Sequence, residues 1–288
     1  MTPDSFFRSC FALYPFPALS RDFFCFSKQT ACIAYAGYDK MVSGKKRFEV
    51  RIKTVFVVLI AAVVLLAAAA GIYVNDYYRA ENVAACMAGG DGVIVRTVPE
   101  GYFFDGPGTE DALVFYPGGK VEETAYAPLL ESLAVRGVDC VLIRMPAKLA
   151  IFGVDRADAV PDAYDYERYY LAGHSLGGAM AANHAAVCPA RWAGLFLLAA
   201  YPTEDLTAAP FPVVFLYGEN DGVLDREKLA KGRALAPANS RSVEIPGGNH
   251  AGFGAYGPQK GDGKAGIPAE AQWQITAETI LETIVEGR

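Results

Sequence analysis

Hydrophobic and polar residues are distributed in two distinct ways along the chain. Residues 54–74 form one apolar run without a charged side chain, whereas short apolar runs alternate with amphipathic stretches from residue 91 onward. At about 1.5 Å per residue, a helix over the first run would span the roughly 30 Å hydrocarbon layer of a bilayer. Because no polar stripe interrupts it, the run favours a membrane-spanning helix over a buried helix of a soluble domain.

The charges that flank the apolar run indicate its orientation. An excess of Lys and Arg holds the nearer end of a membrane helix in the cytoplasm, and the excess here precedes the run: Lys45, Lys46, Arg47, Arg51 and Lys53. The chain is therefore predicted to be a single-pass protein of the cell membrane, with a cytoplasmic N-terminus and residues after 74 outside. A cleaved signal peptide is the alternative, but the run exceeds the usual signal core of roughly 7–15 residues, which favours an uncleaved anchor.

The segments on either side of the run lack a regular pattern. Residues 1–53 are expected to be disordered, because the first forty are rich in aromatic residues, show no helical or strand period and contain helix-breaking prolines. Met41 is a candidate for the true start, since the residues from there to 53 read like the beginning of a membrane-anchored protein. Residues 75–90 are predicted to be a linker.

The alternating region, residues 91–288, predicts one α/β domain. Apolar runs that read as buried strands alternate with stretches of helical spacing, which indicates a mostly parallel sheet with helices on both faces. The predicted strands cover residues 92–98, 112–116, 138–145, 168–173, 193–201, 211–218 and 241–245, and the predicted helices cover residues 124–136, 176–188, 225–235 and 268–285. The connection between residues 201 and 211 is too short for a cap domain, whereas residues 250–266 form a long glycine-rich loop.

The sequence Gly-His-Ser-Leu-Gly at residues 173–177 has the pattern G-x-S-x-G. In a sharp turn from strand to helix, this pattern lifts the serine hydroxyl clear of both elements, and the two glycines avoid the collisions that Cβ atoms would cause. Ser175 is therefore a candidate nucleophile. The pattern is short in a glycine-rich chain, so it needs support from other residues.

A serine nucleophile needs a base, and the chain contains three histidines. His174 leaves the turn in another direction from Ser175, and His184 lies roughly 13 Å along the following helix. His250 remains, and it follows the run 241–245. If that run is the last parallel strand, His250 lies at the carboxyl edge of the sheet, where Ser175 also points.

An acid must orient the histidine, and Asp221 follows the predicted strand 211–218 at the same edge. Asp225 is expected to cap the next helix, and Glu219 is expected to point away. The order along the chain is then Ser, Asp, His.

These residues lie in longer stretches that resemble the α/β-hydrolase family, and in particular a small capless, membrane-anchored subgroup. The stretches are "FYPGGKVEETAYAPL", "MPAKLAIF", "AGHSLGGAMAA", "YGENDGVLDREK" and "GGNHAGFGAYGPQKGDG", and the resemblance covers roughly residue 92 to the C-terminus. The resemblance implies the α/β-hydrolase fold and a serine hydrolase with Ser175, Asp221 and His250 as its catalytic triad.

The chemistry also requires donors for the oxyanion that forms on the substrate carbonyl. The backbone N–H of Leu176 is one candidate, because it lies at the start of the helix after Ser175. The second donor is expected in the "PGG" loop, where Gly119 is the first choice and Lys120 the alternative. Lys120 or Lys148 could also bind an acidic group of the substrate, or both could be solvated surface side chains.

Composition limits the remaining possibilities. The formal net charge of −6 argues against nucleic acid as a partner, and the six cysteines show no zinc-binding spacing. The predicted activity needs no metal or cofactor, because water resolves the acyl-enzyme formed with a small ester or amide. Acyl transfer on the same triad is an alternative, and a non-catalytic binding module of the same fold is another.

Overall fold

The computed structural model describes the backbone of residues 46–287 and the side chains from residue 55 onward. The chain divides into two compact units, Met1–Ala70 and Gly71–Arg288. Disorder was expected for residues 1–53. Residues 1–45, with the candidate start at Met41, lie outside this description, whereas residues 46–53 are helical and differ from that expectation.

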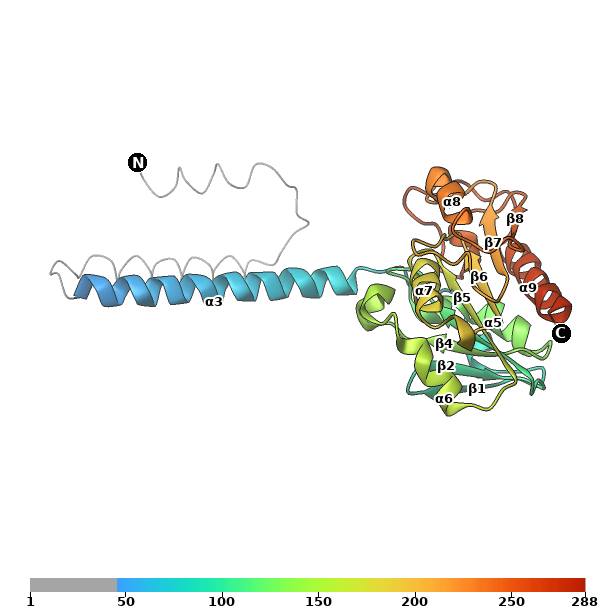
Figure 1. Ribbon diagram of the computed structural model, residues 1–288. Coiled ribbons are helices and arrows are strands. Elements are labelled where there is room, and N and C mark those ends of the chain that lie inside the picture. The colour runs from blue at the N-terminus through green and yellow to red at the C-terminus, as the bar shows by residue number, and fades with distance from the viewer. Residues whose placement is uncertain (1–45, 288) are drawn as a thin grey trace. The chain divides into compact units, whose positions relative to one another are not determined.

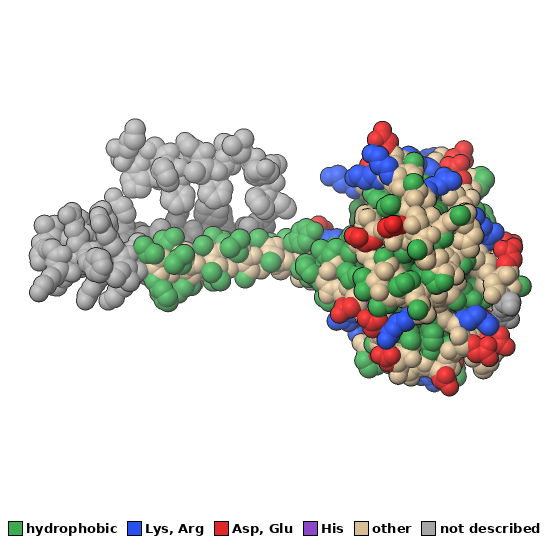
Figure 2. Space-filling view, in the orientation of Figure 1, with side chains coloured by type: hydrophobic (Ala, Val, Ile, Leu, Met, Phe, Trp, Pro, Cys, Tyr) green, Lys and Arg blue, Asp and Glu red, His purple; other side chains and the backbone are tan. Residues whose placement is uncertain are grey.

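Helix α3, Lys46–Asn75, contains the apolar run and begins ahead of it. Its part Val55–Asn75 is long and apolar enough to cross a membrane, and none of it is buried. Figure 2 shows hydrophobic side chains along this part of the helix. Length and composition therefore admit the expected membrane span.

The unit Gly71–Arg288 is built around an eight-stranded sheet with the order β1-β2-β4-β3-β5-β6-β7-β8 (Figure 1). Strand β1 pairs antiparallel with β2, and β2 pairs antiparallel with β4. All other neighbours are parallel, so the predicted mostly parallel sheet is confirmed. The strands are β1 Ile94–Val98, β2 Gly101–Asp105, β3 Asp111–Tyr116, β4 Asp139–Ile143, β5 Arg168–His174, β6 Gly194–Leu198, β7 Val213–Gly218 and β8 Arg241–Ile245.

Strand β2 was not predicted, because its pattern is short and lies directly beside that of β1. Phe103 and Phe104 point to opposite faces of the sheet, and both are buried. Gly101 begins the strand at φ 152°, and a Cβ atom there would lie 2.0 Å from the Leu142 carbonyl oxygen. Strand β4 approaches so closely that only glycine fits at the start of β2, directly after the turn from β1.

Helices cover both faces of the sheet, as the alternation of patterns predicts. Strand β3 shows the two faces clearly, because Leu113 and Phe115 enter one core while Val114 and Tyr116 enter the other. The first core contains side chains of α5 (Ala127–Ala134) and α9 (Ala269–Glu286). The second contains side chains of α6 (Ala159–Ala163), α7 (Leu176–Val187) and α8 (Arg226–Arg233).

The connections differ in length. Residues 199–212 join β6 to β7 through turns and bends. The connection from β4 to β5 carries α6 and three short 3₁₀ helices: η2 Pro146–Lys148, η3 Ala150–Phe152 and η4 Arg156–Asp158. The remaining short helices are α4 Ala84–Ala88, η1 Glu123–Tyr126, η5 Pro189–Arg191 and η6 Ala251–Phe253.

The segment expected to be a linker makes specific contacts. Tyr78 forms a parallel bridge with Val121, and the Glu81 N–H donates to the Ala255 carbonyl at 2.8 Å. Helix α4 follows and packs near α5. Residues 78–88 therefore belong to the packed surface of the unit Gly71–Arg288.

We expect Leu130→Ala to destabilise this unit by about 2–5 kcal/mol, because the side chain is fully buried on α5 and its loss leaves a cavity. Denaturant unfolding of the full chain in detergent micelles measures this loss. The control is Leu66→Ala in α3, where the side chain is 70% exposed. An equal loss in both variants would contradict the assigned core.

Candidate active site

Ser175 lies between β5 and α7 at a turn with unusual backbone geometry. Its φ of 52° and ψ of −122° lie where a residue with a side chain is strained, at a cost of roughly 1–3 kcal/mol. The Ser175 N–H donates to the Leu198 carbonyl at 2.9 Å, which ties the turn to β6. The side chain is half-buried and so remains accessible.

Glycines make this turn possible. A Cβ atom at Gly173 would lie 2.7 Å from the Gly177 carbonyl carbon, and one at Gly177 would lie 2.3 Å from the Pro117 carbonyl oxygen. Real side chains do not tolerate such approaches. The spacing of the two glycines is therefore a requirement of the packing between β3, β5 and α7.

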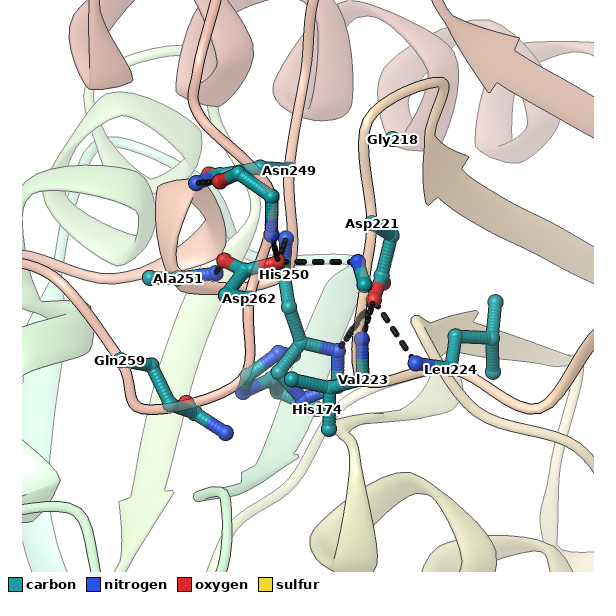
Figure 3. A network of polar contacts seen from close by, with 12 residues as sticks. His174, Gly218, Asp221, Val223, Leu224, Asn249, His250, Ala251, Gln259 and Asp262 are labelled. Atoms are coloured by element: carbon teal, nitrogen blue, oxygen red, sulfur yellow. Dashed lines mark hydrogen bonds and ion pairs between the residues drawn. The ribbon is translucent and has the colours of Figure 1, made fainter.

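Asp221 and His250 are paired in the structure, although they follow different strands. The His250 Nδ1 atom lies 2.9 Å from Asp221 Oδ2, and both side chains are almost fully buried. Asp221 Oδ1 also accepts the N–H groups of Val223 and Leu224 at 2.9 and 2.8 Å (Figure 3). With its carboxylate held by these donors, Asp221 fixes the orientation of the imidazole.

The Ser175 hydroxyl and His250 are not hydrogen-bonded to each other. Within the part of the chain that the structure describes, His250 Nε2 is buried and has no hydrogen-bond partner. The His250 ring does contact His174, with ring centroids 4.6 Å apart, and His174 immediately precedes Ser175 (Figure 3). The structure thus brings the imidazole next to the turn, with one ring nitrogen held and the other unpaired.

His174, which the sequence analysis excluded as the base, is buried. Its Nδ1 lies 2.8 Å from the Tyr126 hydroxyl, and burial, reinforced by the nearby His250, lowers the pKa of His174 well below 6.5. The imidazole is therefore neutral at neutral pH. His184 lies elsewhere, buried on α7 against the Trp192 ring.

The loop after β3 carries the other predicted residues. A Cβ atom at Gly119 would lie 2.9 Å from the Leu176 side chain, so this loop touches the start of α7. The Gly118 N–H donates to the Tyr126 hydroxyl at 3.0 Å, and the Lys120 N–H donates to the Lys148 carbonyl at 2.8 Å. In the described part of the chain, the N–H groups of Gly119 and Leu176 have no acceptor.

The two lysines near this loop differ in their environment, because the Lys120 ammonium group donates to the Tyr73 carbonyl whereas Lys148 is paired with a carboxylate. Lys148 Nζ lies 2.7 Å from Glu123 Oε2, and Arg144 binds the other oxygen of the same carboxylate at 3.1 Å. Burial opposes ionisation of Glu123, but the hydrogen bond from Lys148 outweighs it together with the other donors, and the pKa of Glu123 is lowered. Lys148 is therefore engaged with Glu123.

Asp262 is a residue of this site that the sequence analysis did not identify. Its Oδ1 accepts the N–H groups of Gly222 and His250 at 3.1 and 3.2 Å, and its Oδ2 accepts that of Ala251 at 2.8 Å (Figure 3). One carboxylate thus joins the loop of Asp221 to the backbone of His250. The feature of the sequence that could have indicated Asp262 is the stretch "GDG" at residues 261–263. Its second glycine is required by the packing, because a Cβ atom at Gly263 would lie 1.9 Å from the Asn220 carbonyl oxygen.

Gln272 on α9 supports the same loop from behind. Its Oε1 accepts the Asn249 N–H at 3.1 Å, and its Nε2 donates to the Asn249 carbonyl at 2.9 Å. The backbone just before His250 is therefore fixed by a side chain that is itself buried.

A cavity of about 540 Å³ is lined in part by the neighbours of His250 in the chain, Asn249 and Ala251. Its lining includes Cys86 of α4, Trp273 of α9 and Lys264, but not Ser175. Among the described residues, no group of three or more His, Cys, Asp or Glu side chains is arranged to hold a metal ion. Among the described residues, Cys86, Cys140 and Cys188 are free thiols, and Cys140 is buried.

We expect Asp262→Ala to speed amide hydrogen exchange at His250, Ala251 and Gly222. Loss of the carboxylate leaves these donors without an acceptor, which costs about 1–3 kcal/mol and corresponds to a roughly 5- to 150-fold change in local opening. Exchange followed by mass spectrometry measures this effect. The control is Asp205→Ala, because Asp205 accepts only from Thr207. Unchanged exchange at all three positions would contradict the role of Asp262.

The neutral state of His174 predicts a dependence of stability on pH. Because the pKa of His174 is lower in the folded chain than the unfolded value of 6.5, the unfolded state takes up the proton first as pH falls. The free energy of unfolding should therefore decrease below about pH 6.5, by up to about 1.4 kcal/mol per pH unit for this group.

Denaturant unfolding between about pH 5 and 6.5 should show a shallower slope in His174→Gln than in the unchanged chain. His184→Gln is the control and should change the slope less. Burial lowers the pKa of His184 as well, but the Asp158 carboxylate opposes that shift. Identical slopes for His174→Gln and the unchanged chain would contradict the prediction.

Comparison with known proteins places this geometry in context. The family model described as "Alpha/beta hydrolase family" matches residues 112–274, which is more than half of the chain. Carboxylesterase CesB (YbfK) from Bacillus subtilis is similar in structure, with a TM-score of 0.52, 12% identity, and coverage of 76% of this chain and 99% of that one. Dienelactone hydrolase from Anabaena variabilis has a TM-score of 0.50 and 15% identity, and the match covers 67% and 99% of the two chains. No curated protein matches the chain by sequence.

Proposed function

Because the chain belongs to the alpha/beta hydrolase family, we propose that it is a serine hydrolase that cleaves carboxylic esters, or less readily amides, with Ser175, Asp221 and His250. One observation carries this proposal. The Asp221 and His250 side chains form a buried pair 2.9 Å apart, and the His250 ring lies 4.6 Å from the ring of His174, the residue before the strained turn at Ser175. The solved structure named a carboxylesterase shares the fold and agrees with this reaction class.

The arrangement assigns a role to each atom. With Nδ1–H donated to Asp221, His250 has its lone pair on Nε2, where it can accept the proton of Ser175 Oγ. The oxygen then attacks the substrate carbonyl, and the proton passes to the departing alcohol as the bond between carbonyl carbon and alcohol oxygen breaks. Water resolves the acyl-enzyme by the same steps. The bond between Ser175 and His250 forms when substrate is bound, as apo sites often have long catalytic hydrogen bonds.

The oxyanion is held by the N–H groups of Leu176 and Gly119. Gly119 is favoured over Lys120, since the Lys120 N–H already donates to Lys148 and Gly119 lies against Leu176. Each such donor lowers the barrier by about 3 kcal/mol. The Tyr126 hydroxyl supports this arrangement, because it binds Gly118 on one side and His174 on the other.

The apolar segment 54–74 anchors the enzyme in the cell membrane. The basic residues before it hold the N-terminus in the cytoplasm, so residues 91–288 act outside. Support for the anchor comes from the length and apolar composition of Val55–Asn75.

Ser175→Ala should reduce turnover of p-nitrophenyl acetate by at least about a thousandfold, because the reaction loses its nucleophile. It should also abolish labelling by a fluorophosphonate. Ser132→Ala on α5 is the matched control and should retain both. Retained labelling of Ser175→Ala would disprove the role of Ser175.

Two further outcomes separate the alternatives. Ester or amide products formed from an added alcohol or amine would assign acyl transfer instead of hydrolysis. A folded, unmodified chain that neither turns over esters nor reacts with the fluorophosphonate would favour a binding module.

A further inference from the structure

The chain between the apolar helix and the candidate site is very short. Helix α3 ends at Asn75, and only Asp76 and Tyr77 precede Tyr78. The Tyr78 N–H donates to the Lys120 carbonyl, and the Tyr78 carbonyl accepts the Glu122 N–H, both at 2.8 Å. Three residue steps extend over at most about 11 Å, so the chain cannot carry the Lys120 loop far from the end of the apolar segment.

Tyr78 contacts both of the loops on which the proposed reaction depends. Lys120 directly follows Gly119 in the loop after β3. The Tyr78 hydroxyl also accepts the Lys260 N–H at 3.1 Å, and its ring lies 5.6 Å from that of Tyr256. The loop that contains Tyr256 and Lys260 also begins with His250. The anchor is thus attached at the rim of the site and not at the opposite edge of the sheet.

The same rim exposes large apolar side chains. Ile151 and Phe152 in η3 are 49% and 61% exposed, and this segment reaches the oxyanion loop through the hydrogen bond from the Lys120 N–H to the Lys148 carbonyl. Val223 is 39% exposed and lies two residues after Asp221. Apolar side chains from two different strand ends therefore flank the rim. Such side chains are stabilised when they enter the boundary between lipid headgroups and acyl chains.

We propose that the substrate is an ester that resides in the lipid bilayer, and that the enzyme takes it from the membrane surface to which the short tether holds its rim. This inference rests on the proposed hydrolase function and on the proposed anchor. The tether keeps the rim at the interface, and the exposed apolar side chains shield the acyl chain as the ester group enters the site. Attachment to the same surface also raises the effective concentration of a lipid substrate at the site.

Lengthening the tether tests this proposal directly. A flexible Gly/Ser segment of about 20 residues, inserted after Asn75, adds a mean span of about 25 Å. The full chain is reconstituted in phosphatidylcholine vesicles that contain a minor fraction of p-nitrophenyl palmitate. We expect turnover of this ester to fall about tenfold or more, because the effective concentration decreases steeply with span. Turnover of soluble p-nitrophenyl acetate should remain unchanged.

Matched variants control for the insertion itself and for the surface. The same segment inserted between Ala238 and Asn239, exposed residues ahead of β8, should change neither activity. Phe152→Asp should lower the ratio of vesicle to soluble turnover about tenfold. Val285→Asp should not, because that exposed side chain lies at the far end of α9.

The two assays distinguish failure of this inference from failure of the proposed function. Hydrolysis of the soluble ester with equal vesicle turnover for the long and short tethers would overturn the membrane substrate alone. The same conclusion would follow if the vesicle ester were not hydrolysed at all while the soluble ester was. If the unchanged chain hydrolysed neither ester and did not react with a fluorophosphonate, the hydrolase proposal itself would fall.

Discussion

The candidate site depends on two carboxylates that hold one loop. Asp221 binds the ring of His250, while Asp262 binds its backbone and also the Gly222 N–H. These contacts combine the segments after β7 and β8 into one rigid piece, although each alone would be a mobile loop. An imidazole whose ring and backbone are both held has little freedom to rotate, so it loses little entropy when it accepts a proton.

A second constraint is the turn at Ser175. Its strained backbone conformation persists because the neighbouring strands and helix hold it in place. Gly177 allows β3 to approach the start of α7, and the Ser175 N–H is bound to β6. The strain is therefore balanced by the packing of three parallel strands, β3, β5 and β6, which lie in the middle of the sheet. The same packing contacts therefore stabilise the fold and hold Ser175 in place.

The sequence predicted those parts of the molecule that leave a periodic or chemical pattern. Strand β8 has the predicted bounds and α9 nearly so, because continuous apolar or amphipathic patterns define them. Elimination among the histidines led to His250, since His174 was expected to leave the turn in another direction and His184 to lie along the following helix. The structure pairs His250 with Asp221, whereas the role of Ser175 stays a prediction.

The remaining features depend on contacts that leave no recognisable pattern in the sequence. Asp262 acts by accepting backbone N–H groups, and such groups are present at almost every position of the chain. The attachment of Tyr78 to the Lys120 loop joins residues far apart in sequence, and the stretch around it has no periodicity. Strand β2 was not predicted, because its short pattern directly follows that of its hairpin partner, β1. In each case, the feature is determined by which backbone groups contact each other in the folded chain.

The position of β8 at one end of the strand order has a consequence for the biogenesis of the protein. The loop with His250 follows this strand, and Gln272 of the C-terminal helix fixes it from behind. A chain emerging from the ribosome can therefore assemble the earlier strands around Ser175 before its histidine is in place. The imidazole reaches its partner only after β8 has been synthesised, so a product truncated before this strand would keep much of its sheet and have no competent base.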